Sequence, residues 1–289
     1  MKKYLDLPLR IALMISGILF VFALPTLIGI EKTLTINFKP FREFVEINIH
    51  KLTQIKDPQF LSLFEQMNMA ESYRYSMSIV VASLLVVIIV GILGALMVQL
   101  APRKIGNLFR KMTDFFESVP DLLIIFLFMF FVITLYKTTG LKFLQLYGIF
   151  GHKPYFVPIV TIAFLPTLFF MQFLIKALEG EESRDYVLYL KAKGIRKSRI
   201  LIVHMIRNIF PLLIIQLRTS IWIILSNLYL LEFMFNINGF TKTFPIAMGM
   251  GEFLLLVICL LLFTLPLLVI EAISLLVLTF FKGKESVSL

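Results

Sequence analysis

Long runs of apolar residues separated by polar stretches dominate the hydropathy pattern of the chain. A helix needs about 20 mainly apolar residues to cross the hydrocarbon core of a bilayer. Six runs reach or approach that length: Ile11 to Ile28, Met77 to Leu100, Leu122 to Tyr136, Phe156 to Ile175, Phe210 to Leu231 and Phe253 to Phe281. The third run is short, so we expect its helix to begin before Asp121. The pattern predicts an all-α, polytopic membrane protein with about six transmembrane helices.

The runs divide the chain into three parts. Residues 1–30 hold a basic N-terminus and the first span, residues 31–75 lie between the first two spans, and residues 76–289 hold the other five. No small-x-small cleavage motif follows the long first run, so we expect a retained span rather than a signal peptide. Apolar residues on either side of Pro58 recur at roughly helical spacing, which predicts two short amphipathic helices. These helices fit either a structural cap or a docking surface for a solute-binding protein.

Composition and charge support the membrane assignment. A hydrophobic content of 59%, a charged content of 16% and a mean hydropathy of +0.91 exclude an ordinary soluble domain. The net charge of +10 would suggest nucleic acid in a soluble protein. Here the basic residues sit mostly beside the apolar runs, where they set orientation. Of the 28 Lys and Arg residues, 17 lie on the side that carries the N-terminus, which we assign to the cytosol; we expect no nucleic-acid partner.

The longest polar insertion in the second half of the chain runs from Asp185 to Pro211, within a cytoplasmic segment that we place at residues 179–210. Apolar residues precede and follow Gly194 at roughly helical spacing, so Gly194 is expected to separate two short helices. The small residues Ala192 and Gly194 leave room for another surface to approach the backbone. A basic interfacial helix without a protein partner is the alternative.

This insertion resembles the membrane subunits of binding-protein-dependent ABC importers, in the oligopeptide, dipeptide and nickel permease branch. A second match follows the fifth span, and a weaker one precedes the third span at residues 114–120. The insertion carries the first match at Asp185, Tyr186, Ala192, Lys193, Gly194, His204, Arg207, Asn208 and Pro211, and the second consists of Glu232, Phe235 and Gly239. Strong matching covers about residues 185–248.

The resemblance implies a function in solute import. The chain would form half of a translocation path and would couple ATP hydrolysis by separate subunits to import of a peptide or another small solute. The implied partners are two ATP-binding subunits, a second permease subunit that is homologous or identical, an extracytoplasmic solute-binding protein and the lipid bilayer. The implied location is the cell (plasma) membrane of a bacterium, as a multi-pass protein. The implied ATPase-coupling residues are Asp185, Tyr186, Ala192, Lys193, Gly194 and Ile195.

Two alternatives belong to other functional classes. One is a membrane scaffold or sensor that docks an ATPase without moving substrate, and the other is an intramembrane enzyme. The chain has no G-x-x-x-x-G-K-[ST] phosphate loop, so we expect no ATP hydrolysis by this chain itself. The three histidines show no metal-ligand spacing, and Cys259 is expected to be a packing residue. We expect no catalytic residue, no metal and no cofactor, and hence no enzyme.

Two charged residues interrupt the last two apolar runs. Arg218 lies seven residues beyond Pro211, about 10 Å into the span, and Glu271 lies eleven residues before Lys282, about 16 Å deep. A long arginine side chain can bridge the difference in depth if the two helices are neighbours. The pattern therefore predicts an intramembrane ion pair between Arg218 and Glu271. The alternative is that Arg218 extends to the cytosolic surface while Glu271 faces a water-filled path.

Overall fold

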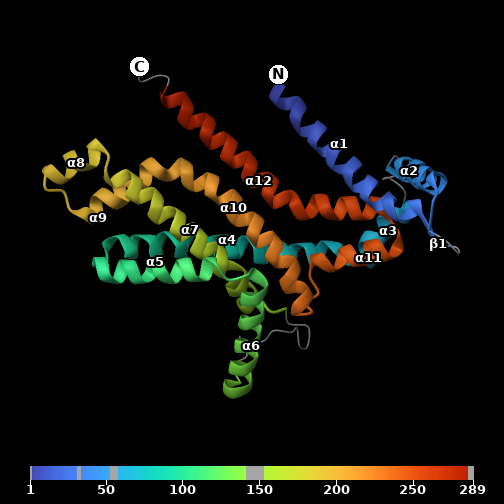
Figure 1. Cartoon of the computed structure of the whole chain (residues 1–289), viewed down its shortest axis with the longest axis horizontal. Coiled ribbons are helices and arrows are strands. Elements are labelled where there is room, and N and C mark those ends of the chain that lie inside the picture. Colours follow the sequence, from blue (N-terminus) through green and yellow to red (C-terminus); the bar gives the residue numbers. More distant parts are fainter. Residues whose placement is uncertain (1, 31–33, 53–57, 141–152, 286–289) are drawn as a thin grey trace. The chain divides into compact units, whose positions relative to one another are not determined.

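The computed structural model describes residues 2–30, 34–52, 58–140 and 153–285 (Figure 1). Contacts group them into two units, which we describe separately. The first unit combines the chain up to Tyr73 with Lys242–Phe263. The second combines Arg74–Thr241 with the residues from Thr264 onward. Two long helices, α4 (Met69–Leu100) and α12 (Phe253–Glu285), contribute to both units.

The first unit surrounds a small apolar core of Leu19, Phe253 and Val257. Within this unit, an ionic contact joins Lys51 Nζ to Glu252 Oε1 at 3.0 Å. Its further elements are α1 (Lys2–Ala23), the 3₁₀ turn η1 (Leu24–Leu27), β1 (Ile28–Ile30), β2 (Leu34–Ile36), α2 (Phe38–Leu52), α3 (Pro58–Gln66) and α11 (Thr243–Met250). The helices α2 and α3 confirm the prediction of two short helices on either side of Pro58. The antiparallel pair β1 and β2 was not predicted and is a small addition to a helical fold.

The second unit carries most of the predicted spans. The helices α7 (Phe156–Glu182) and α10 (Ile206–Met234) pack along each other and bury apolar side chains such as Leu174 and Ile224. The other elements are α5 (Arg103–Glu117), α6 (Asp121–Thr139), α8 (Asp185–Ala192), α9 (Lys197–Arg199), the π-helical turn η3 (Ile200–Met205) and the 3₁₀ turn η4 (Phe240–Lys242).

Five helical stretches are long and apolar enough to cross a membrane, and they coincide with the second to sixth predicted spans. They are Met69–Leu100, Asp121–Thr139, Phe156–Glu182, Lys197–Met234 and Phe253–Val277. The first predicted span corresponds to a shorter apolar stretch, Ile15–Leu27. The all-α, polytopic class is therefore confirmed. The division at residues 30 and 75 into cytosolic, extracytoplasmic and core parts stays a prediction.

The third span begins at Asp121 and not before it, contrary to the expectation from its short apolar run. Pro120 is the N-cap of α6, and its ψ of 137° (φ −59°) lies outside the helical range, so the helix does not continue before Asp121. The residues before it form the separate amphipathic helix α5, which ends at Glu117. The third span is thus the helix α6 alone, and a short break separates it from α5.

Candidate functional site

The predicted coupling segment folds into a short helix with a defined stop. The helix α8 begins at Asp185, and Gly194 adopts a left-handed conformation (φ +74°) two residues after the helix ends. The N–H of Gly194 donates to Lys191 O (3.0 Å), and the N–H of Ile195 donates to Leu190 O (3.2 Å). This pair of bonds is a Schellman motif, which favours glycine because side chains with a Cβ are strained at positive φ. The predicted helix break at Gly194 is therefore confirmed.

A carboxylate at the end of α7 fastens this short helix to the transmembrane bundle. Glu181 is buried, and its Oε2 accepts hydrogen bonds from the Tyr186 hydroxyl (2.5 Å) and from Asn208 Nδ2 (2.7 Å). The Nε of Arg184 lies 3.7 Å from the other carboxylate oxygen. These groups come from α7, α8 and α10, so the Glu181 carboxylate links α8 to two spans. We call Glu181, Tyr186 and Asn208 the coupling triad.

The environment of the triad keeps the Tyr186 hydroxyl protonated. Burial, followed by the hydrogen bond and the negative charge of Glu181, raises the pKa of Tyr186 from 10.0 to about 12. An ordinary tyrosine is already protonated at neutral pH, and the raised pKa extends the pH range in which the hydroxyl donates. The neutral Tyr186 hydroxyl and the Asn208 amide stabilise the buried Glu181 carboxylate by donating hydrogen bonds to it.

The opposite side of α8 faces outward. Val187 is buried, whereas Leu188 and Tyr189 are 53% and 60% exposed. The Nζ of Lys193 lies 4.5 Å from the centre of the Tyr189 ring, a cation–π contact. The predicted coupling residues Asp185, Ala192, Lys193 and Gly194 are also exposed, and Tyr186 and Ile195 are half-buried. The helix is thus anchored on one side and offers apolar and charged groups on the other.

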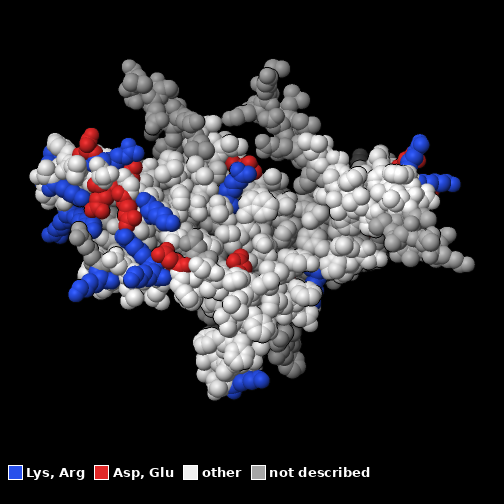
Figure 2. Space-filling model, in the orientation of Figure 1, with Lys and Arg blue, Asp and Glu red and all other residues white. Residues whose placement is uncertain are grey.

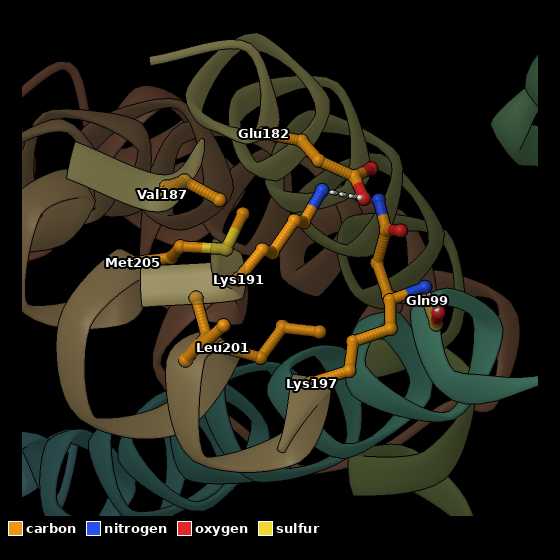
Figure 3. Close-up of a pocket in the computed structure, with 8 residues that line it drawn as sticks. Gln99, Glu182, Val187, Lys191, Lys197, Leu201 and Met205 are labelled. Carbon is orange, nitrogen blue, oxygen red and sulfur yellow. Dashed lines mark hydrogen bonds and ion pairs between the residues drawn. The ribbon is translucent and has the colours of Figure 1, made fainter. Parts of the chain in front are cut away.

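Further contacts tie the segment after Gly194 to α4. The Nζ of Lys197 donates to the backbone oxygen of Gln99 on α4 (2.7 Å). Before Gly194, Lys191 Nζ on α8 lies 3.0 Å from Glu182 Oε1 on α7. Figure 3 shows these side chains around a small pocket between α8, η3 and the end of α4. Because its polar lining groups pair with one another, the pocket is a packing feature of the coupling segment.

Basic side chains gather around this segment. Figure 2 shows Lys and Arg over the region where α8 and α9 lie in Figure 1. Those in the coupling segment are exposed: Lys191, Lys193, Arg196, Lys197 and Arg199. Such a concentration beside span ends is typical of the cytosolic side of a membrane protein.

The second predicted signature forms a separate buried cluster. Glu232 is fully buried at the end of α10, and its Oε2 accepts hydrogen bonds from the N–H and the hydroxyl of Thr241 (2.9 and 2.6 Å). Its Oε1 accepts a 2.5 Å hydrogen bond from the Ser76 hydroxyl of α4. Phe235 is also fully buried, and a Cβ on Gly239 would overlap the Glu232 carboxyl group. The signature therefore fixes the turn after α10 against α4.

The two signatures lie at opposite ends of α10. Asn208 and Glu232 are 24 residues apart on one helix, which corresponds to about 36 Å. The structure does not combine the predicted residues into one site. One set lies in the segment around α8, and the other lies at the opposite end of α10.

The structure brings Arg218 and Glu271 together. Arg218 Nη2 on α10 lies 3.4 Å from Glu271 Oε1 on α12, and the two side chains are 52% and 26% exposed. The approach matches the geometry expected from their depths in the sequence. The pair is less enclosed than the coupling triad, so its functional role stays a prediction.

Several residues of these clusters were not identified in the sequence. Glu181 is one of several acids near the end of a span, and only its distance of five residues from Tyr186 hints at a pairing. Ser76 lies 156 residues from Glu232, so no local pattern connects them. Among the described residues, no group of three or more His, Cys, Asp or Glu side chains could hold a metal ion. His152 lies outside the described residues.

Comparisons with known proteins agree with this arrangement. The family model for the binding-protein-dependent transport system inner membrane component matches residues 87–284, about two thirds of the chain. The metal-staphylopine import system permease protein CntB of Staphylococcus aureus is 24% identical over 156 residues, in strains Mu50 / ATCC 700699 and NCTC 8325 / PS 47. The alignment covers 54% of this chain and 48% of CntB, so the chain spans about half the length of these curated relatives.

The family match includes the coupling segment and the Glu232 cluster, which the structure places at the two ends of α10. It also covers the five long apolar stretches from α4 onward, except for the start of α4. The chain belongs to the family of binding-protein-dependent transport system inner membrane components.

Proposed function

We propose that this chain is the permease subunit of an ABC importer and forms half of its translocation path. Two separate ATP-binding subunits hydrolyse ATP, and the chain itself catalyses no reaction. A second permease subunit, homologous or identical, completes the path, and an extracytoplasmic solute-binding protein delivers the solute. The protein resides in the cell membrane of a bacterium.

The coupling triad is the observation that carries this proposal. It links α8 to α7 and α10 through one buried carboxylate, while Leu188 and Tyr189 remain exposed on the outer side of α8. An ATPase subunit that binds this exposed side is connected through the triad to the two spans α7 and α10. Closure of the two ATPase subunits would then bias the bundle between two arrangements, as allosteric coupling requires.

The solute is a peptide or another small hydrophilic molecule. The sequence resemblance favours the oligopeptide, dipeptide and nickel permease branch. The name of CntB, a permease of a metal-staphylopine import system, adds a metal complex of a small organic ligand to the candidates. These solutes share polar and charged groups that need a hydrated route across the membrane.

The test is recovery of the ATPase subunits with an Asp185→Lys variant. Asp185 is exposed at the first turn of α8, where a negative charge favours the helix N-terminus and a positive charge opposes it. We expect Asp185→Lys to reduce co-purification of the ATPase subunits. Glu43→Lys, a charge reversal on the exposed surface of α2, is the matched control.

Three outcomes would count against this proposal. Normal ATPase recovery with Asp185→Lys would remove α8 as the docking element. ATPase binding without any solute-stimulated ATP hydrolysis in the complete complex would favour a membrane scaffold or sensor. Activity of the isolated chain without an ATPase would favour an enzyme.

A further inference from the structure

The outer surface of α5 is divided into two stripes that run along the whole helix. The apolar stripe is 48–66% exposed and consists of Ile105, Leu108, Phe109, Met112 and Phe115. The polar stripe is also exposed and consists of Asn107, Lys111, Asp114 and, just beyond the helix, Ser118. Steps of three and four residues place the members of each stripe on one face of the helix. A helix surrounded by hydrocarbon on every outer face would not carry the polar stripe.

The neighbouring helix α7 carries a matching polar stripe towards its cytosolic end. It consists of Gln172, Lys176, Glu179 and, just beyond the helix, Ser183. The spacing is four, three and four residues, as in the polar stripe of α5. Gln172 is half-buried, and the other three are exposed.

Side-chain contacts join α5 to α7 along their polar stripes. Gln172 Nε2 donates a 2.6 Å hydrogen bond to Asp114 Oδ1, and Arg110 forms an ion pair with Glu179. On its inner side α5 is close to α4, because a Cβ on Gly106 would lie 3.2 Å from the Val98 backbone oxygen. Figure 1 shows α5 running beside α4. The polar stripe of α5 and the polar stripe of α7 therefore form one continuous surface, which we call the polar seam.

The polar seam extends from the polar end of α7 into the apolar run that ends at Ile175. Gln172 lies ten residues before Glu182, the last residue of α7, which corresponds to about 15 Å along the helix. Asp114 lies at the same level, since it accepts a hydrogen bond from Gln172. Exposed ionisable groups level with an apolar run face a water-filled cavity or the interior of a bundle, because contact with acyl chains is too costly.

We propose that the polar seam is the wall that this subunit contributes to a water-filled path, and that Asp114 is its deepest charged contact. The inference rests on the proposed function and specifies the solute. Lys111 and Lys176 offer positive charge beside the negative charge of Asp114. A surface of both signs suits a hydrophilic solute that carries both amino and carboxylate groups.

Thiol labelling of the assembled complex in proteoliposomes tests the orientation of α5. Cys259, the only cysteine, is buried and is first replaced by alanine. Single cysteines then replace Asn107, Lys111 and Ser118 of the seam or Leu108, Met112 and Phe115 of the apolar stripe. The probe is a positively charged, membrane-impermeant methanethiosulfonate. We expect the seam positions to react at least about tenfold faster, because only a hydrated thiol ionises readily.

Either of two results would overturn the proposal. The positions of the apolar stripe would react at least as fast as the seam positions if the apolar side of α5 faced the path. The seam positions would be unreactive in the complex but reactive in the isolated subunit if the seam were buried against another protein. Labelling does not require ATP turnover, so a reactive seam in a complex without solute-stimulated hydrolysis would contradict the transport function alone.

The role of Asp114 is tested by the charge of the probe. The cysteine at position 118 lies one helical turn from Asp114, so the carboxylate attracts a cationic reagent and repels an anionic one. We expect the ratio of cationic to anionic labelling rates at this cysteine to fall about threefold with Asp114→Asn. The same ratio for a cysteine at position 107, almost two turns away, is the control. An unchanged ratio at position 118 would show that Asp114 does not face the path.

Discussion

The Ser76 hydroxyl donates a 2.5 Å hydrogen bond to Glu232 Oε1, and both residues are fully buried. The same hydroxyl oxygen accepts a 2.8 Å hydrogen bond from the N–H of Phe240. One small side chain on α4 thus connects the carboxylate at the end of α10 to the backbone of η4. These side-chain bonds add to the backbone hydrogen bonds of the turn, such as that from the N–H of Ile237 to Glu232 O (3.0 Å).

Replacement of Ser76 by alanine is expected to destabilise the protein by about 1–3 kcal/mol, because it leaves a buried carboxylate oxygen and a buried N–H without this partner. The measurement is the unfolding midpoint of purified protein in detergent. Ser78→Ala is the matched control, since the exposed Ser78 hydroxyl donates only to Tyr75 O within its own helix. Equal midpoints for the two variants would contradict a structural role of the Ser76 hydrogen bonds.

The coupling triad makes a prediction about Tyr186. Tyr186→Phe removes the donor to Glu181 while retaining the ring, so we expect the protein to insert normally and to lose coupling. The readout is the ratio of transported solute to hydrolysed ATP. Tyr136→Phe is the control, because Tyr136, near the end of α6, belongs neither to the triad nor to the exposed side of α8. An unchanged ratio in Tyr186→Phe would argue against the triad as the mechanical link.

The same residue has a pH signature. The pKa of Tyr186 in the folded protein is about 12 against an ordinary value of 10.0, with burial as the main cause. The folded state therefore favours the protonated phenol, and this contribution to stability is present below pH 10 and is lost as the pH rises through about 12. The difference in phenolate absorbance between the wild type and Tyr186→Phe should titrate near pH 12. A midpoint near pH 10 would contradict the buried hydrogen bond.

Features that depend on local pattern were predictable from the sequence. Apolar length indicated the spans from α4 onward, since a bilayer imposes a minimum helix length. The stop at Gly194 followed from one glycine between two helical patterns. The approach of Arg218 to Glu271 followed from depth, because each residue of a helix advances it by a fixed rise.

Features that depend on distant contacts were not predictable. The charged residues of α5 lower its hydropathy, so the apolar runs of the sequence do not indicate this helix. Its apolar and polar stripes become recognisable only from its position beside α7. Glu181 became recognisable only through Asn208, which is 27 residues away. The Ser76 and Glu232 pair depends entirely on the packing of α4 against the end of α10.

The coupling segment makes a second prediction, which separates two reasons for the glycine at position 194. Gly194 has a φ of +74°, and a Cβ added there would meet open space, with none of the surrounding described residues within 4 Å. If the backbone conformation alone is required, Gly194→Asn should retain ATPase binding, because asparagine tolerates this conformation, and Gly194→Val should lose it. If an ATPase surface approaches the backbone closely, both variants should fail. Normal co-purification of the ATPase with Gly194→Val would contradict both explanations.

The Arg218 and Glu271 pair makes the last prediction. Each single reversal, Arg218→Glu or Glu271→Arg, places two like charges near each other within the spans and should lower the yield of folded protein. The distance of 3.4 Å and the side-chain exposures of 52% and 26% place the expected loss between about 1 kcal/mol for a surface pair and about 3–5 kcal/mol for a buried one. The double reversal restores opposite charges and should recover part of the loss.

The exposed pair of Arg42 and Glu46 on α2 provides the control for this experiment. Its atoms lie 2.8 Å apart, closer than those of Arg218 and Glu271, but its side chains are 81% and 62% exposed. Reversal of either charge there should change the yield little, because solvent screens an exposed pair. If the double reversal at Arg218 and Glu271 is no better than the worse single variant, and cysteines at the two positions cannot be crosslinked, the two residues do not pair. Arg218 would then extend to the cytosolic surface, and Glu271 would face water.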